Sequence, residues 1–221
     1  MARRLTGFLA AVACLASGMS SHAGSSELRL SVHQFRVVER ESGRTNYYSV
    51  VDDPVRPFIR GEYRPVMDTA VYGLEIPESE RKTALELRWS WRARTLPQDA
   101  STCSHGSGIA DSAALVYVVW KRGLRWYTLR YAWSTSAAKG NVCDSRRNPF
   151  VAQDTVVLES GAGSGQWVSE TIDLKAAFRR HFADGDPNAE VPDLVGVGLL
   201  TDGDQSHSDS AADYADFVLR N

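Results

Sequence analysis

The chain has 221 residues, with 25 lysines and arginines against 27 aspartates and glutamates and a formal net charge of −2. A nearly balanced chain without a basic block lacks the electrostatic footprint that nucleic acids or anionic membranes require, so we expect neither as a partner. Apolar stretches after the N-terminal region fall short of the roughly 18 residues of a spanning helix, so no transmembrane segment is expected. The oligomeric state leaves no signature in the sequence.

Residues 1–23 have the organisation of a secretory signal peptide. Arg3 and Arg4 form a positive start, and residues 5–19 are apolar or small. The Ser-His-Ala sequence that ends the segment offers a cleavage site. We therefore expect the mature chain, residues 24–221, to be secreted or periplasmic.

The three cysteines are interpreted in the light of this compartment. A cut before Cys14 would give a lipid-modified protein, but Ala11 is smaller than the residue that such a site prefers. Removal of the leader leaves Cys103 and Cys143 in two turn-rich segments, and export predicts a disulfide between them. A catalytic thiol is the alternative, which only the nearby His105 supports.

Short strand candidates follow one another along the mature chain. Before residue 80, where prolines interrupt the pattern, they are 28–38, 45–51, 57–64 and 70–76. Later candidates are longer and alternate more clearly: 83–96, 113–121, 125–135, 154–160, 166–174, 192–202 and 212–220. Lys121, Arg122 and Gly123 separate two of these at hairpin distance. The glycine-rich stretch 161–165 is expected to be a second hairpin turn.

One segment has helical periodicity. Asp173 can cap residues 174–182, where Leu174, Ala177 and Phe178 share a face. About ten strands and one helix predict an all-β fold, namely a jelly-roll or lectin-like β-sandwich with one short helix. No linker or repeat divides residues 24–221, so we expect a single β-sandwich domain.

The RWSWRAR stretch carries a candidate ligand-binding face. Its alternation places both tryptophans, including Trp91, on one side and Arg88, Arg92 and Arg94 on the other. The guanidinium fork suits carboxylates and hydroxyl-rich ligands, and Asp111 is an expected partner of one of these arginines. The alternative is an exposed sheet face whose arginines pair with nearby acids.

A second candidate is the acid-rich loop near the C-terminus. Asp202, Asp204 and Asp213 have part of the spacing of a calcium loop, so Ca²⁺ is a candidate ligand of these three carboxylates. A helical calcium loop requires glycine where His207 stands and a glutamate at the end. The alternative is a turn in which aspartate and glycine only shape the backbone.

Signatures of catalysis are sparse, and no catalytic residue is assigned. The glycine-rich stretch lacks the Lys-Ser/Thr ending of a phosphate loop, and the hydrolase and metalloprotease motifs are missing from the sequence. A hydrolase or lyase on this scaffold would combine Arg92 with Asp111 or Asp202, and with Tyr117 or His207 as the base.

The order and spacing of these stretches resemble a known family. The W-x-W-R strand, an aspartate before an aromatic–aliphatic strand, and a T-D-x-D loop before a final Y-x-D-F resemble the secreted bacterial family catalogued as domain of unknown function 3047. The matching positions are Trp89, Trp91, Arg92, Asp111, Trp133, Trp167, Thr201, Asp202, Asp204, Tyr214 and Asp216. The resemblance implies a lectin-like or jelly-roll sandwich and export, and it implies no activity.

Three functions follow as hypotheses. The first is a carbohydrate-binding protein, or one for another small polar ligand, with Arg88, Trp91, Arg92, Asp111, Asp202 and Asp204 as its contacts. The second is a polysaccharide hydrolase or lyase on the same scaffold. The third is a structural, envelope-associated interaction protein, which an exposed apolar patch would favour.

Overall fold

The structure is a computed structural model that describes residues 26–38, 46–65, 67–98, 103, 111–163 and 165–221. The signal peptide, the start of the domain at residue 24 and a lipid-modified Cys14 lie outside the described residues and stay predictions. Within the described ranges, no helix is both long and apolar enough to cross a membrane.

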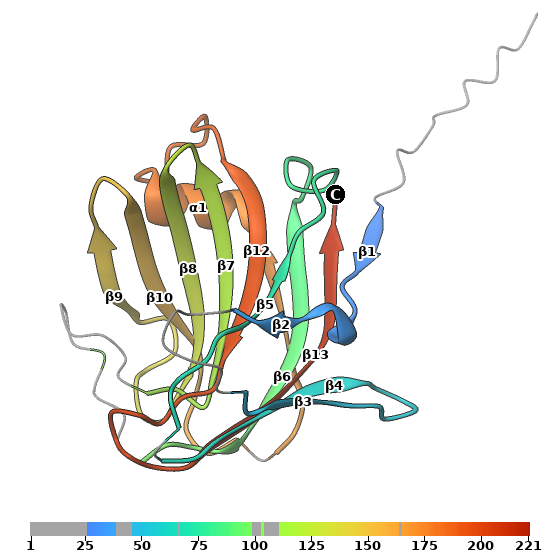
Figure 1. Ribbon diagram of the computed structural model, residues 1–221. Coiled ribbons are helices and arrows are strands. Elements are labelled where there is room, and N and C mark those ends of the chain that lie inside the picture. The colour runs from blue at the N-terminus through green and yellow to red at the C-terminus, as the bar shows by residue number, and fades with distance from the viewer. Residues whose placement is uncertain (1–25, 39–45, 66, 99–102, 104–110, 164) are drawn as a thin grey trace, which may run out of the picture.

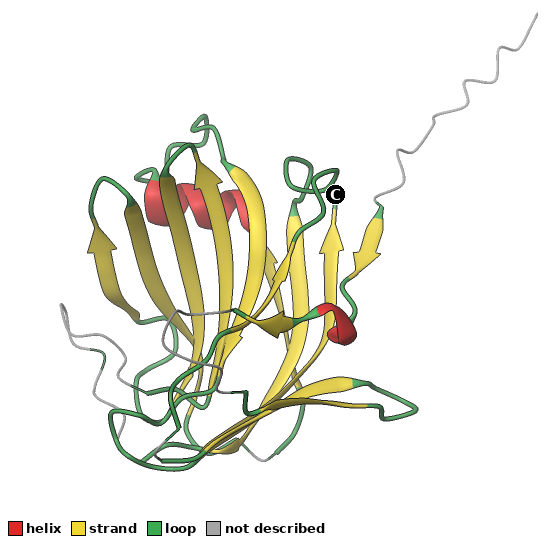
Figure 2. Cartoon of the chain, viewed as in Figure 1, coloured by secondary structure: helices red, strands yellow, loops and turns green. Residues whose placement is uncertain are grey.

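Two sheets face each other (Figures 1 and 2). One has six strands, in the order β11 (Val168–Asp173), β6 (Glu86–Thr95), β13 (Ser210–Arg220), β4 (Phe58–Tyr63) and β3 (Tyr48–Val51), with β1 (Glu27–Arg29) also pairing with β13. The other has seven, in the order β2 (Arg36–Val37), β5 (Tyr72–Glu75), β12 (Asp193–Leu200), β7 (Ala114–Arg122), β8 (Arg125–Ser134), β10 (Val151–Ser160) and β9 (Val142–Arg147). The described chain adds one α-helix, α1 (Leu174–Phe182), and a 3-10 turn, η1 (Val32–Gln34). The predicted β-sandwich with one short helix is confirmed.

Alternating side chains fill the space between the sheets. Leu87, Trp89 and Trp91 of β6 are fully buried. The ring centroid of Trp89 lies 5.6 Å from that of Tyr131, and that of Trp91 lies 5.8 Å from that of Trp133. Successive strand residues point to opposite faces, and in β6 the face that carries both tryptophans is the one that forms the core.

Helix α1 closes one end of this core. The Asp173 carboxylate caps it by accepting a hydrogen bond of 2.8 Å from the Ala176 N–H, as the sequence predicted. The Phe178 ring packs against Trp120 and Tyr127, at centroid distances of 5.6 and 5.1 Å. Figure 1 shows α1 behind β7 and β8, so the seven-stranded sheet turns its outer face toward the viewer.

The prediction of a hairpin turn at residues 161–165 is wrong. Strand β10 belongs to the seven-stranded sheet and β11 to the six-stranded one, so this stretch crosses between sheets. The Trp133 indole N–H donates to the Gly161 carbonyl oxygen at 3.0 Å, and a Cβ at Gly163 would lie 2.6 Å from the same ring. The glycines therefore allow the crossover to lie directly against Trp133.

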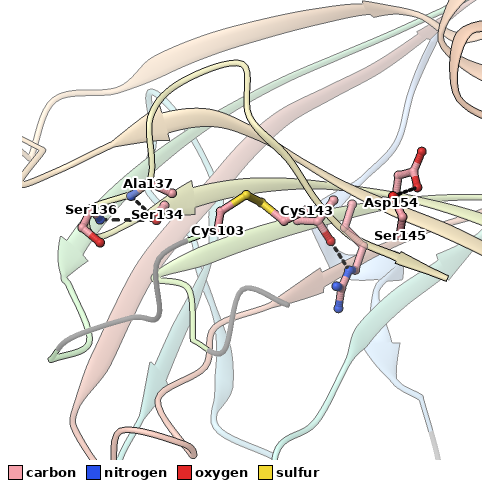
Figure 3. Close-up of a disulfide and its surroundings, with 9 residues drawn as sticks. Cys103, Ser134, Ser136, Ala137, Cys143, Ser145 and Asp154 are labelled. Atoms are coloured by element: carbon pink, nitrogen blue, oxygen red, sulfur yellow. Dashed lines mark hydrogen bonds between the residues drawn. A yellow bond between two sulfur atoms is a disulfide. The ribbon is translucent and has the colours of Figure 1, made fainter. Parts of the chain in front are cut away.

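The predicted disulfide is confirmed, with 5.5 Å between the Cα atoms of Cys103 and Cys143 (Figure 3). Both thiols are consumed, which excludes the catalytic-thiol alternative; His105 lies outside the described residues. The bridge adjoins a second hydrophobic cluster, on the outer face of the seven-stranded sheet. This outer apolar cluster consists of Leu115, Ala132, Ala137, Cys143, Val157 and Leu200.

Candidate functional site

The residues predicted to bind ligand fall into three separate places. Asp111, Asp202 and Asp204 form an acidic cluster at one end of the sandwich. Arg92 lies on the outer face of the six-stranded sheet, and Trp91 lies in the core. These residues therefore do not line one common pocket.

The acidic cluster is built by the antiparallel pairing of β12 with β7. Asp202 follows the end of β12 and Asp111 precedes the start of β7, so the pairing brings the two together. The Asp202 N–H continues the ladder by donating to the Ser112 carbonyl oxygen at 3.1 Å. One carboxylate oxygen from each of Asp111, Asp202 and Asp204 lies within 4.8 Å of the other two.

Buried tyrosines hold the end of β12 in place. The Tyr47 hydroxyl donates to the Thr201 carbonyl oxygen at 2.9 Å, and the Tyr48 hydroxyl accepts from the Thr201 N–H at 3.1 Å. The Thr201 and Tyr214 hydroxyls are 2.8 Å apart. All four side chains are buried. Asp202 therefore extends from a rigid anchor, and the spacing of these tyrosines in the sequence gave no sign of it.

The loop after Asp202 wraps around the Asp111 carboxylate. The backbone N–H groups of Gln205 and Ser206 donate to its two oxygens at 3.2 and 2.7 Å. A Cβ at Gly203 would lie only 2.2 Å from the Ser208 carbonyl oxygen, so the loop closes this tightly only with glycine there. Asp111 thus fixes the conformation of the loop by accepting hydrogen bonds from its backbone.

The carboxylates of Asp202 and Asp204 are poorly neutralised by their surroundings. Burial, with the neighbouring carboxylates of Asp204 and Asp111, raises the pKa of Asp202 to about 7. Burial and the charge of Asp111 also raise the pKa of Asp204, whose buried Oδ1 has no hydrogen-bond partner. Three convergent carboxylates fit the oxygen-rich coordination of Ca²⁺. Calcium binding stays a prediction, with Asp111 now in the donor set.

Asp213 is not a member of the acidic cluster. Its fully buried carboxylate accepts from Arg60 Nε at 3.0 Å and pairs with Arg92 Nη2 at 2.7 Å. Arg94 lies 3.9 Å away on the same side. Two corrections follow: Asp213 pairs with arginines rather than joining Asp202 in binding a cation, and it replaces Asp111 as the partner of Arg92.

The prediction that Trp91 contacts a ligand also has to be corrected. It is fully buried and its indole N–H donates to the Glu170 carboxylate at 3.2 Å, so its ring is not available for stacking on a ligand. Arg92 instead lies 4.6 Å from the ring centroid of Trp167. Arg88 is half-buried on the opposite side of β6 from the tryptophans.

Sequence reasoning missed a groove on the outer face of the seven-stranded sheet. It has a volume of about 980 Å³ and is lined by β2, β5, β12, β7 and the start of β8. Trp126, with 41% of its surface exposed, stands at one wall, and the Lys121 ammonium lies 4.5 Å from its ring centroid. Alternation in the strand 125–134 contained this signal, because burial of Tyr127 requires that Trp126 point outward.

Strand register explains why the groove is open. Gly196 pairs with Val119, and Gly198 pairs with both Gly73 and Tyr117. A Cβ at Gly196 would approach only the Leu74 carbonyl oxygen, at 3.3 Å, so this part of the floor carries no side chain. Glycine inside a strand marks a place where a ligand can approach the backbone. The groove measures near the upper end of the roughly 300–1,000 Å³ of ligand pockets.

The fold and this groove define a β-sandwich with a hollowed outer sheet face. The chain belongs to the DUF3047 family, described as "Protein of unknown function", whose model matches residues 34–218. Among curated proteins, none matches the sequence. The resemblance drawn from the sequence motifs is therefore confirmed.

Several solved structures are similar in fold. A xyloglucanase domain of NopAA from Sinorhizobium fredii, in complex with cellobiose, has 9% identity and a TM-score of 0.46, covering 90% of this chain and 99% of its own. A cellulase derived from Cel12A of Rhodothermus marinus has 15% identity and a TM-score of 0.45, covering 90% and 100%. A family 11 carbohydrate-binding module from Clostridium thermocellum has 7% identity and a TM-score of 0.38, covering 91% of each chain.

Proposed function

We propose that this protein is exported and binds a polysaccharide in the groove on the outer face of its seven-stranded sheet. The observation that carries the proposal is the exposed Trp126 ring in a groove whose floor carries no side chain at Gly196. The C–H face of a sugar ring is apolar and packs against an aromatic face, while its hydroxyls need polar partners at the edge. Trp126, Tyr117 and Glu75 line the same groove and offer both kinds of contact.

Export is supported by two observations. The N-terminal residues have the pattern of a cleavable leader. The Cys103–Cys143 disulfide is typical of an oxidising compartment. A secreted or periplasmic protein meets polysaccharides there, which agrees with the proposed ligand.

The hydrolase or lyase hypothesis depended on Arg92 and a base residue lying in one cleft, and these residues do not share one. Arg92 lies on the six-stranded sheet and Tyr117 on the outer face of the seven-stranded sheet, so the two do not flank one cleft. His207 is exposed in the loop beyond Asp202. Binding without hydrolysis is therefore the function we propose.

The test is isothermal titration against a panel of neutral and acidic polysaccharides, each with and without a chelator. We expect Trp126→Ala to weaken binding roughly tenfold, because the stacking surface is lost. The matched control is Leu124→Ala, an exposed apolar side chain of the same hairpin that does not line the groove. Flat traces for the wild type, or equal losses in both variants, would count against the groove. Release of reducing sugar would show hydrolysis instead.

A further inference from the structure

The side chains that line the groove are unequally charged. Among the described residues that line it, Arg36, Arg81 and Lys121 contribute three positive charges, and Glu75 is the acidic residue. The cations stand on three different segments, because Arg36 is in β2, Lys121 is near the end of β7, and Arg81 follows β5. They are therefore distributed around the groove rather than gathered at one point.

Lys121 has no carboxylate partner among the described residues. Its ammonium lies over the face of Trp126, 4.5 Å from the ring centroid, so the cation and the proposed stacking surface adjoin. Asp193 is its cross-strand neighbour on β12, yet the two make no ion pair within 4.0 Å. An exposed ammonium beside an aromatic face is placed to meet an acidic group on a ring stacked there.

Arg36 and Arg81 are held by backbone oxygens rather than by strong ion pairs. Arg36 Nη1 donates to the carbonyl oxygens of His33 and Phe35, which fix the guanidinium without cancelling its charge. Arg81 Nε donates to the Ile76 carbonyl oxygen at 2.8 Å. Its contact with Glu75 is 3.9 Å long, and the Glu75 side chain is 93% exposed, so this pair is weak.

We propose that the polysaccharide bound in this groove is a polyuronate, a chain with a carboxylate on each sugar. This inference rests on the proposed function and names its ligand class. Guanidinium groups bind carboxylates through paired hydrogen bonds, and an ammonium adds a point charge. Repeated carboxylates along a polymer match cations that are spaced along a groove.

The experiment compares four ligands of similar length by titration: an oligogalacturonate, an oligoalginate, a sulfated oligosaccharide and a neutral cello-oligosaccharide. We expect the two uronates to bind at least tenfold more tightly than the neutral chain at low salt. Raising NaCl from about 50 mM to 500 mM should weaken uronate binding markedly, because salt screens exposed charges.

Lys121→Gln should weaken uronate binding about fivefold to tenfold, more than it weakens binding of the neutral chain, and Lys121→Arg should restore uronate binding. Arg180→Gln, an exposed cation on α1 outside the groove, is the matched control. Tighter binding of the neutral or the sulfated chain overturns the polyuronate but keeps the polysaccharide groove. Failure of all four ligands overturns both proposals.

Discussion

Two buried aspartates near the C-terminal end of the sequence lie in opposite electrostatic surroundings. Asp213 meets Arg60 and Arg92 on the outer face of the six-stranded sheet, and its carboxylate raises the pKa of Arg60. Asp202 meets two further carboxylates, so burial and repulsion favour its protonated form. Whether a buried aspartate of this chain is charged or protonated therefore depends on the side chains around it, and residue type alone does not predict it.

The first prediction concerns this ion pair. Asp213→Asn keeps the volume but leaves two half-buried guanidiniums without a counter-charge, so the free energy of unfolding should fall by about 2 kcal/mol. Glu62→Gln, at the exposed contact with Arg94, should cost less than about 1 kcal/mol. Denaturant unfolding of both variants checks the difference, and equal effects would contradict the role given to burial.

At the scale of elements, the outer face of the seven-stranded sheet divides into two parts. Toward the disulfide, outward-facing Leu115, Ala132 and Val157 form the outer apolar cluster. Farther along the same strands, Tyr117 and Lys121 line the groove. Alternation predicts that these residues share a face, but not that one half of the face is covered and the other half is open.

The second prediction separates these two halves. Replacing both Cys103 and Cys143 by serine should lower the free energy of unfolding by about 4 kcal/mol, because the unfolded chain regains the entropy of an open loop. Polysaccharide affinity, measured well below the unfolding temperature, should stay within about twofold of the wild type. A large loss of affinity in a folded variant would show that the bridge also shapes the groove.

At the scale of the whole molecule, two buried acids give stability an optimum in pH. Burial raises the pKa of Asp154, but hydrogen bonds from His181, Arg147 and Ser145 outweigh it and lower that pKa to about 2. Asp154 therefore stabilises the fold above about pH 4, and this stability is lost as the pH falls toward 2. Asp202 acts in the opposite direction.

The third prediction follows from Asp202, whose pKa rises to about 7 on folding. Between about pH 4 and 7 the folded chain holds a proton that the unfolded chain has released, so stability falls as the pH rises, by on the order of 4 kcal/mol. Asp202→Asn should flatten this fall and be more stable than the wild type at pH 8. Denaturant unfolding at pH 5, 6, 7 and 8 measures both proteins.

The same variants test calcium binding at the acidic cluster. At pH 8 the carboxylate of Asp202 is ionised and a cation would offset the repulsion within the cluster, so millimolar CaCl₂ should raise the melting temperature of the wild type, and a chelator should reverse the change. Asp202→Asn should respond less, and Asp213→Asn should respond as the wild type does. Identical melting curves with and without Ca²⁺ in the wild type would make the calcium prediction wrong.

Much of the fold could be predicted from the sequence because its signals are local. Strand alternation, the cap at Asp173 and the hairpin at Gly123 each depend on residues a few positions apart. The glycines near Gly163 led to the wrong prediction of a hairpin turn, because a tight hairpin and a crossover between sheets use the same residue types. The groove was missed because it is formed by residues on five strands.

By itself the sequence determined the sandwich class, the cysteine pair and the family, since these follow from periodicity, composition and motif order. Only the tertiary structure decided which acids meet. Pairing of β7 with β12 brings Asp111 to Asp202, and pairing of β13 with β4 and β6 turns Asp213 toward arginines. The physical reason is that a carboxylate's charge state and partners depend on strand register between distant segments, which no local pattern encodes.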